Sequence, residues 1–367
     1  MNKILILGGY GHFGSKIAET LAKEGIPIIL AGRNPAKMTS FQTELGKRYP
    51  DCEVECCVFD VFKSLDKKLQ DLQPKLVIHT CGPFQGQDYK IAESCIKHRV
   101  HYIDLADARD YVRDISTLNE QAIQNQVAVI SGASTVPALS SAVIEEYQSL
   151  FVELGSLKFG ISSAQQTPGG VATTEAILSY TGKEIPGFPG AKGKVYGWQG
   201  LHQVTFPVCG KRWMSNCSIA DLDLFPLKYG FQDIQFSGGV ENSFLHLGLW
   251  MISWLVRAGL PLSLEKRGNF FYRVSKMFDR FGSGTGGMYM YIRGKDLWNN
   301  SKTVKWYIIA KNNHGLHIPT IPAIVLAKKI YLDQYQTPGA LPCVGLVSLK
   351  ECLHEMAHLD ITIYVAT

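Results

Sequence analysis

Three glycines near the start of the chain directly follow the apolar run 3–7. Gly9, Gly11 and Gly14 have the spacing G-x-G-x-x-G. In such a loop the first glycine allows a tight turn, the second lets the backbone approach a pyrophosphate, and the third lets a helix pack closely on a strand. The helix expected at 13–23 would direct its amide groups and positive dipole end at the phosphates. Because a strand precedes the loop and a helix follows it, the motif predicts a dinucleotide site rather than a ligand-free turn.

The end of the second expected strand, within 27–34, indicates which dinucleotide is bound. NAD enzymes place Asp or Glu here, on the ribose 2′-hydroxyl, but this chain has no carboxylate there and carries Arg33 instead. A guanidinium can hold a 2′-phosphate through two hydrogen bonds, and Lys37 adds a second positive charge. The pattern favours NADP(H), with NAD(H) as the alternative cofactor and a solvated turn arginine as the alternative role of Arg33.

Strands and helices alternate along the first part of the chain, which predicts an α/β fold with a doubly wound parallel sheet. Further strands are expected at 53–59, 76–80, 101–104 and 127–131. Ligands of such sheets bind beyond the carboxyl ends of the strands. The candidate site residues at those ends are Asp60 and Val61, then Cys81, Gly82, Pro83, Phe84 and Gln85, then Asp107, and finally 133–135.

A change of pattern after Pro137 and the expected helix 138–147 predicts a second, α+β domain. Strands of a mixed or antiparallel sheet are expected there at 157–162, 195–199, 203–206, 233–237, 287–294 and 304–310. The turn 167–174 precedes a helix, and it could present amide groups to an anionic substrate or could be a plain helix entry. The expected domains are 1–139 for the cofactor, 140–318 for substrate binding or oligomerisation, and 319–367 as a C-terminal segment that packs back on the first domain.

The composition limits the partners and the compartment. An apolar fraction of 46% supports large cores, and a net charge of +5 without blocks of like charge gives no indication of a nucleic-acid partner. The nine cysteines lack C-x-x-C spacing, which is typical of free thiols in a reducing cytoplasm. Cys52, Cys56 and Cys57 cluster without a histidine, so no zinc site is predicted. The short apolar start leads into glycines rather than a cleavage site, and a cytoplasmic protein is expected.

Two further patterns have competing interpretations. The sequence 354–358 matches H-E-x-x-H, but too few residues follow it to supply a third zinc ligand, so a chance match is favoured. The apolar stretch 244–264 contains Arg257, and Gly259 and Pro261 interrupt it, which favours a core or oligomer-interface helix over a membrane span. Basic and aromatic residues in 265–280 leave contact with a membrane surface as the less favoured alternative.

Five segments occur in a characteristic order along the chain, namely 8–14, 81–87, 101–107, 319–323 and 339–342. Through these motifs the chain resembles the saccharopine dehydrogenase family, in its bacterial branch of uncertain substrate. The resemblance implies an NAD(P)-binding first domain, a domain inserted after the sixth strand, and a C-terminal segment that returns to the first domain. It also implies that the pyrophosphate is contacted by Gly9, Gly11, His12, Phe13 and Gly14, and the 2′-phosphate by Arg33. The nicotinamide side would be contacted by Cys81, Gly82, Pro83 and Phe84. The remaining predicted cofactor contacts are Tyr10, Asn34, Asp60 and Val61.

The predicted function is that of an NADP-preferring oxidoreductase, in which the cofactor does the hydride chemistry and the protein orients it. The substrate would be a small amino acid, imine or carbonyl compound bound between the domains, and the protein would be a homodimer. Asp107 is the candidate for the accompanying proton transfer, with a helix-capping role as its alternative, while Cys81 is expected to be a small neighbour of the nicotinamide rather than a nucleophile. The competing function is a non-catalytic NADP(H) sensor or scaffold that could associate with a membrane.

Overall fold

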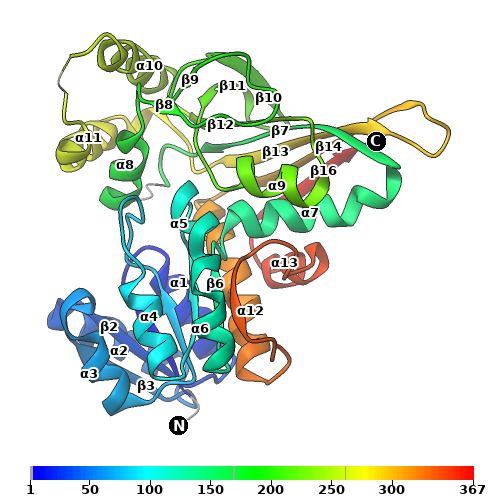
Figure 1. The fold of residues 1–367 in the computed structure, drawn as a ribbon. Helices are drawn as coiled ribbons and strands as arrows, with labels where there is room; N and C mark the ends of the chain where they lie inside the picture. Colours follow the sequence, from blue (N-terminus) through cyan, green and yellow to red (C-terminus); the bar gives the residue numbers. More distant parts are fainter. Residues whose placement is uncertain (1–2, 168–169, 261) are drawn as a thin grey trace. The chain divides into compact units, whose positions relative to one another are not determined.

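The computed structural model describes residues 3–167, 170–260 and 262–367. The chain forms two compact units, each of which is discontinuous in sequence. The first unit comprises Met1–Ala142 and His317–Glu355, and the second comprises Val143–Leu316 and Met356–Thr367. Figure 1 labels the elements of both units.

The first unit contains a sheet of seven parallel strands, which confirms the predicted α/β fold with a doubly wound sheet. The strand order is β15-β6-β5-β4-β1-β2-β3. Most of these strands are buried on both faces, because helices cover a parallel sheet on either side, and their sequences are accordingly continuous apolar runs. The strands are β1 (Ile4–Leu7), β2 (Ile28–Gly32), β3 (Val54–Val58), β4 (Leu76–His79), β5 (His101–Asp104), β6 (Ala128–Ser131) and β15 (Gly339–Pro342).

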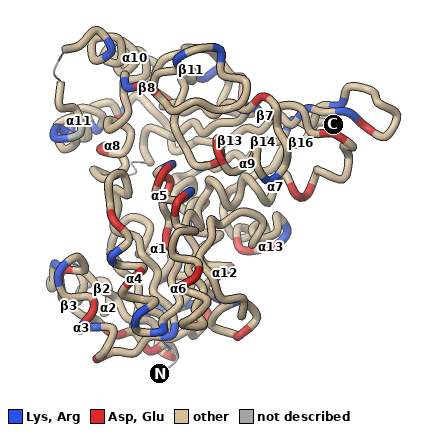
Figure 2. The backbone as a smooth tube through the Cα atoms, in the orientation of Figure 1, with Lys and Arg blue, Asp and Glu red and all other residues tan. Residues whose placement is uncertain are grey.

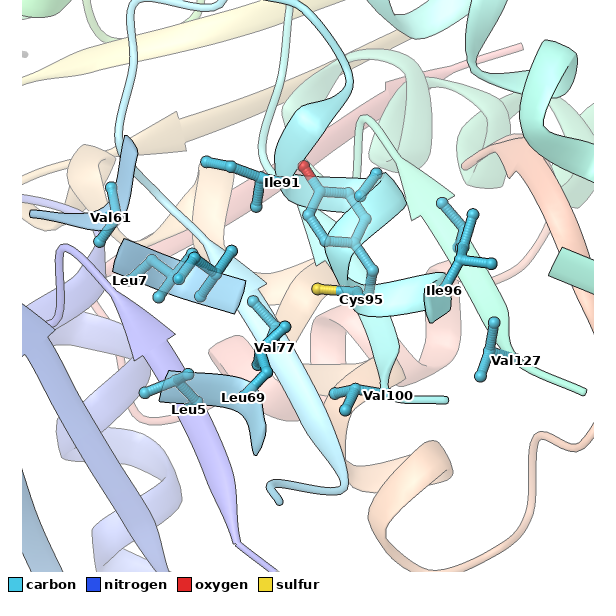
Figure 3. Close-up of a cluster of buried hydrophobic side chains, with 14 of the residues drawn as sticks. Leu5, Leu7, Val61, Leu69, Val77, Ile91, Cys95, Ile96, Val100 and Val127 are labelled. Atoms are coloured by element: carbon cyan, nitrogen blue, oxygen red, sulfur yellow. The ribbon is translucent and has the colours of Figure 1, made fainter. Parts of the chain in front are cut away.

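Amphipathic helices pack on this sheet. Helix α1 buries Ile17, Ala18 and Leu21, which recur at helical spacing. One core cluster joins apolar side chains of the strands with those of α3 and α4, among them Leu5, Val77 and Leu69 (Figure 3). The helices of this unit are α1 (Gly14–Lys23), α2 (Pro35–Arg48), α3 (Val61–Leu72), α4 (Lys90–Lys97), α5 (Arg109–Arg113), α6 (Asn119–Gln124), α12 (Ile321–Tyr331) and most of α13 (Leu349–Met356).

The C-terminal segment returns to the first unit, as predicted. Strand β15 pairs with β6, and α12 contacts α1, β4 and β5. Lys328 of α12 forms ion pairs with Glu24 at the end of α1 and, at 2.6 Å, with Glu355 of α13. Buried apolar residues and these ion pairs therefore tie the segment to the N-terminal part of the chain.

The last residues of the chain correct one expectation. The whole range 319–367 was expected to pack on the first domain, but β16 (Ile361–Ala366) pairs antiparallel with β14 of the second unit. Ile361, Ile363 and Val365 alternate with Thr362 and Tyr364, a period-two pattern that suits a strand at the edge of a sheet. The tail thus divides between the two units.

The second unit contains a mixed sheet with the strand order β10-β11-β12-β7-β13-β14-β16, which confirms the predicted α+β class. Strands β12 and β7 are parallel, and the other pairs are antiparallel. The strands are β7 (Glu153–Ser163), β10 (His202–Phe206), β11 (Gly210–Asn216), β12 (Asp233–Val240), β13 (Gly286–Lys295) and β14 (Ser301–Ala310), beside a small pair β8 (Glu184–Ile185) and β9 (Val195–Tyr196). Helix α7 (Ser140–Tyr147) crosses the unit boundary, and α8 (Gly170–Ser179), α9 (Asp221–Tyr229), α10 (Ser243–Arg257) and α11 (Gly268–Met277) complete the unit.

Local sequence misjudged two segments here, and part of a third cannot be compared. Strand β11 was not expected, because Gly210–Asn216 is mostly polar. The strand expected at 195–199 ends at Tyr196, since Trp198 and Gly200 have positive φ angles of 60° and 69°. Pro168 and Gly169 of the expected anion-binding turn lie outside the described residues. No helix in the part of the chain that the structure describes is long and apolar enough to cross a membrane.

Candidate cofactor site

The glycine loop between β1 and α1 has the geometry that its sequence predicts. Gly8 has a φ of +79°, and the Gly11 amide donates to the Gly8 carbonyl at 2.8 Å, which closes a tight turn. A Cβ atom on Gly14 would collide with the Gly8 carbonyl oxygen, so only glycine lets α1 begin so close to the loop. A Cβ atom on Gly11 would meet only that same oxygen, at 3.0 Å, and otherwise project into open space. The open side of Gly11 is the place where a phosphate can approach the backbone.

The N-terminus of α1 suits an anion. Phe13 occupies the cap position without any side-chain cap, and the first turn contains no acidic residue. The positive end of the helix dipole is therefore neither capped nor neutralised from within the helix. His12 beside it is exposed, and Phe13 is half-buried. The residues present fit a pyrophosphate at this helix end.

Tyr10 and Asn34 build the turn that carries Arg33. The Tyr10 hydroxyl accepts hydrogen bonds from the backbone amides of Arg33 and Asn34, at 3.0 and 2.9 Å, while the ring lies against Gly32. The Asn34 side chain caps α2 by accepting from the Lys37 amide at 3.0 Å. Arg33 and Lys37 are exposed, and within 3–167, 170–260 and 262–367 no side chain forms an ion pair with Arg33. The guanidinium is thus available at the carboxyl end of β2.

The loop after β4 is held in one shape by two residues that sequence reasoning missed. The Gln87 side-chain amide donates to the carbonyls of Cys81 and Pro83, at 2.9 and 2.7 Å. His79 lies fully buried below the loop, with its Nε2 atom 3.3 Å from the Gln87 Oε1 atom. Burial lowers the pKa of His79 to about 4, so its ring is neutral at physiological pH. The sequence signal that could have identified His79 is its position as a polar residue at the end of the otherwise apolar strand β4.

Cys81 lies where the loops after four strands converge. Its Sγ atom is 3.0 Å from the position of a Cβ on Gly8, after β1. Burial raises the pKa of the Cys81 thiol to about 12, while the charge of Arg33 lowers it and that of Asp60 raises it. The thiol therefore stays protonated and is a poor nucleophile, consistent with the role expected for it. Arg33 and Asp60 follow β2 and β3, so the predicted cofactor residues gather at one end of the sheet.

Three of the predicted contacts have structural roles of their own. The Asp60 carboxylate caps α3 by accepting from the Phe62 amide at 3.1 Å, and the Val61 side chain belongs to the core. Phe84 is buried, with its ring centroid 5.0 Å from that of His79. Gly82 is exposed and is therefore the open position of the loop. Contacts of Asp60, Val61 and Phe84 with a cofactor stay predictions.

Asp104 ends β5 and Asp107 follows the strand, and the two side chains have different environments. Asp107 is exposed and accepts from the Gln85 side chain at 3.2 Å. Its alternative role as a helix cap is wrong, because Ala108 precedes α5 and no side chain caps that helix. Burial by the surrounding loops raises the pKa of Asp107, and the hydrogen bond from Gln85 opposes this shift.

Asp104 is fully buried, and sequence reasoning did not single it out. Its Oδ1 atom accepts from the amides of Ala106 and Gly132, at 2.9 and 2.8 Å, and from the Ser131 hydroxyl at 3.0 Å. These bonds tie the loop after β5 to the loop after β6. Burial raises the pKa of Asp104 to about 6, although these hydrogen bonds oppose the shift.

The H-E-x-x-H sequence does not form one helical face. His354 lies in α13, but the helix ends at Met356, before His358. Across 3–167, 170–260 and 262–367, no group of three or more His, Cys, Asp or Glu side chains is arranged to hold a metal ion.

The first part of the chain, residues 4–130, matches the family model of the saccharopine dehydrogenase NADP binding domain. On these residues the chain is similar to the NADP binding domain of saccharopine dehydrogenases. The predicted resemblance is thereby confirmed on these residues, and NADP(H) is confirmed as the cofactor of the domain. The match covers β1 to β6 and includes the glycine loop, Arg33 and the loop after β4.

Comparisons with individual proteins show lower similarity. A very-long-chain 3-oxoacyl-CoA reductase of Lodderomyces elongisporus is 23% identical over 190 residues, which cover 50% of this chain and 47% of that protein. The chain thus spans about half the length of this relative. An amine dehydrogenase from Mycobacterium smegmatis has a similar structure over 94% of this chain and 95% of its own, with 10% identity and a TM-score of 0.49. A short-chain dehydrogenase from Sphingobium yanoikuyae, in complex with NADPH, covers 36% of this chain and 70% of its own, with 13% identity and a TM-score of 0.28.

Proposed function

We propose that this protein is an NADP-preferring oxidoreductase that transfers a hydride to or from a small amino acid, imine or carbonyl compound. The observation that carries the proposal is the exposed Arg33, which stands beside the glycine loop where NAD enzymes carry a carboxylate. When bound, NADP(H) supplies the hydride, and the protein supplies orientation and electrostatics.

Different residues of the NADP-binding domain bind different parts of the cofactor. The open side of Gly11 and the uncapped start of α1 bind the pyrophosphate. Arg33, with Lys37, binds the 2′-phosphate through charge-assisted hydrogen bonds. The exposed Gly82 and the protonated Cys81 thiol offer a small, uncharged surface to the nicotinamide. His79 and Gln87 support this surface from below and keep the loop in place.

Asp107 is the residue we propose for the proton that accompanies hydride transfer. Its carboxylate is exposed at the carboxyl end of β5, and Gln85 orients one of its oxygens. Asp104, in contrast, is enclosed by loop amides and acts as a positioning residue for the loops after β5 and β6.

The proposal includes a homodimer that acts on a small molecule in the cytoplasm. All nine cysteines are free thiols, which suits a reducing compartment. Sedimentation of the purified full chain tests the dimer, and fluorescence microscopy of a tagged chain tests the location.

Turnover with NADPH tests the proposed function. A panel of 2-oxo acids with amines, cyclic imines and aldehydes, followed by the loss of nicotinamide absorbance, should include at least one substrate. Asp107→Asn should lower kcat by about 100-fold or more and remove a limb of the pH profile, because general acid–base catalysis contributes about that much. Asp110→Asn is the matched control, since Asp110 is also exposed but pairs with Arg113 at 3.0 Å. Tight NADPH binding without turnover of any class would instead support the sensor or scaffold alternative.

A further inference from the structure

Helix α10 of the second unit differs from an ordinary surface helix in which side chains it buries. Its buried residues are His246 and Ser253, both polar. Its outward positions include Phe244, Met251 and Leu255, which are 81%, 61% and 46% exposed. These three residues recur at spacings of seven and four, so they form one stripe along the helix.

The two buried polar side chains of α10 have hydrogen-bond partners. The His246 Nε2 atom lies 3.0 Å from the Ser215 hydroxyl of β11, and the Ser253 hydroxyl donates to the Trp250 carbonyl at 2.6 Å. The helix contacts β11 and β12 through this side. The Ser253 hydroxyl also lies 3.4 Å from the Trp198 carbonyl, so polar contacts of His246 and Ser253 join α10 to the rest of the unit.

Helix α11, the next α-helix along the chain, also exposes apolar side chains. Phe270 and Met277 are 62% and 72% exposed, and Arg273 lies between them on the same side of the helix. Figure 1 shows α10 and α11 as consecutive helices at one end of the second unit. We call Phe244, Met251, Leu255, Phe270 and Met277, with the basic residues of 243–281, the α10–α11 patch. Exposed apolar side chains gathered in this way mark an interaction surface.

The charge of the patch indicates the partner. The range 243–281 contains six Lys and Arg residues and only two Asp and Glu residues, and so holds most of the formal net charge of +5 of the whole chain. Figure 2 shows basic residues on α11 and at the end of α10. Arg267, Arg273 and Arg280 are exposed, whereas Lys276 pairs with Asp279 at 2.9 Å. Basic residues around exposed Phe, Met and Leu are the pattern of a segment that lies in the interface of an anionic membrane.

We propose that the α10–α11 patch docks the protein on the surface of a membrane that contains anionic lipids. A second copy of this chain fits less well, because a twofold interface would bring the same excess of positive charge against itself. Helix α10, with 15 residues, is shorter than the roughly 20 residues needed to cross a bilayer, so it lies along the surface. The apolar side chains enter the headgroup boundary, and the arginines contact lipid phosphates. This proposal extends beyond the oxidoreductase function and does not depend on it.

Sedimentation of the full chain with vesicles tests the proposal. Vesicles of phosphatidylcholine containing phosphatidylglycerol should bind the protein, pure phosphatidylcholine should bind it much less, and added salt should weaken binding. The double variant Met251→Gln/Phe270→Gln should bind about tenfold or more weakly, because two apolar anchors are lost. Arg273→Glu/Arg280→Glu should weaken binding to the anionic vesicles by about tenfold or more.

Matched controls lie elsewhere in the second unit. Trp298→Gln removes an exposed apolar side chain from the β13–β14 hairpin, and Lys305→Glu reverses an exposed charge on β14. Both should keep vesicle binding within about twofold of the unchanged protein. Circular dichroism should show all variants folded, since every substituted side chain is exposed. Absence of binding to anionic vesicles, equal losses in the controls, or a lipid-free dimer that Met251→Gln/Phe270→Gln dissociates would overturn the proposal.

Discussion

Helices α1 and α10 show how differently the two units use apolar residues. Helix α1 buries Ile17 and Leu21 against the parallel sheet. Helix α10 buries His246 and Ser253, and it exposes Phe244, Met251, Trp254 and Leu255. In the first unit an apolar stripe marks the side that faces the core. In the second unit the same kind of stripe marks the surface. The contrast shows that periodicity identifies a helix and its apolar face but not the partner of that face.

The two units also differ in how burial and hydrogen bonds set the pKa of a carboxyl group. Asp104 of the first unit has a pKa raised to about 6 by burial. Burial also raises the pKa of Glu241 in the second unit, but hydrogen bonds from Gln165 and Ser283 and the charge of Arg212 outweigh it, so the pKa is lowered. The first site therefore favours the neutral acid, and the second favours the carboxylate.

Truncation gives the largest expected effect. Removal of all residues after Thr320 deletes α12, in which eight residues are buried, and strand β15. Loss of side chains such as Ile324, Leu326 and Ile330, worth about 1.5 to 3 kcal/mol each, should exceed a total stability of about 5–15 kcal/mol. The truncated chain should aggregate or lose its cooperative thermal transition. A soluble truncated chain with normal NADPH affinity would show that the C-terminal segment is an independent appendage.

A shorter deletion sharpens this comparison. Removal of 361–367 deletes only β16, which belongs to the sheet of the second unit. The NADP-binding domain should keep its NADPH affinity in this variant, measured by nicotinamide fluorescence. A loss of NADPH binding equal to that of the longer truncation would contradict the assignment of β16 to the second unit.

Gly11→Val should separate binding from folding. The added side chain meets only the Gly8 carbonyl at 3.0 Å, but it fills the space that the pyrophosphate needs. Loss of two charge-assisted hydrogen bonds, at about 1.5–3 kcal/mol each, predicts NADPH binding weaker by about 100-fold or more. Gly46→Val in α2, where a Cβ meets nothing within 4 Å, is the matched control and should bind normally. If Gly11→Val is folded and binds NADPH as tightly as Gly46→Val, the loop is not the phosphate site.

Asp104→Asn tests the first buried carboxylate. Because burial raises the pKa in the folded state from 3.8 to about 6, this group contributes stability that is fully present below pH 3.8 and is lost as the pH rises through about 6. The free energy of unfolding of Asp104→Asn, relative to the unchanged protein, should therefore increase by about 3 kcal/mol between pH 4 and 7. Urea unfolding at each pH measures it, and a difference independent of pH would show that the pKa of Asp104 is the same in the folded and unfolded states.

Glu241→Gln should give the opposite sign. The lowered pKa of Glu241 contributes stability that is present above its unfolded pKa and is lost as the pH falls through the lower, folded value. Glu241→Gln should therefore be less stable than the unchanged protein at pH 7, and the gap should shrink toward acid pH in the same urea series. A gap that widens in acid would contradict the role of Arg212, Gln165 and Ser283 as its partners.

Arg33→Ala should have the smallest effect, confined to the choice of cofactor. Loss of the charge-assisted bonds to the 2′-phosphate should weaken NADPH binding by about 2 kcal/mol, roughly 30-fold, and leave NADH binding nearly unchanged. Lys47→Ala, at the far end of α2, is the control and should not alter the preference. Equal affinity of the unchanged protein for both cofactors, or a preference retained in Arg33→Ala, would refute the assignment of the 2′-phosphate to Arg33.

The cofactor end of the first unit could be predicted from sequence because its signals are local. The glycine spacing, the apolar runs and the absence of an acid near Arg33 each depend on neighbouring residues, and the strands β1 to β6 lie close to their expected positions. His79, Gln87 and Asp104 could not be identified in this way. Their roles depend on burial and on partners brought together by the parallel sheet, as in the pairing of Asp104 with Gly132 across two loops.

By itself the sequence determined the class of the fold and the glycine loop of the cofactor site, because steric limits on glycine and burial of apolar faces act within a few residues. The return of the C-terminal segment was expected from the family resemblance, since it depends on contacts between distant residues. Only the tertiary structure decided which unit receives β16, which way α10 faces, and which acid has a raised pKa. Each of these depends on contacts between residues far apart in the chain. The same apolar or acidic residue can be satisfied by a core, by a hydrogen-bonding partner or by a surface, and only the folded chain selects among them.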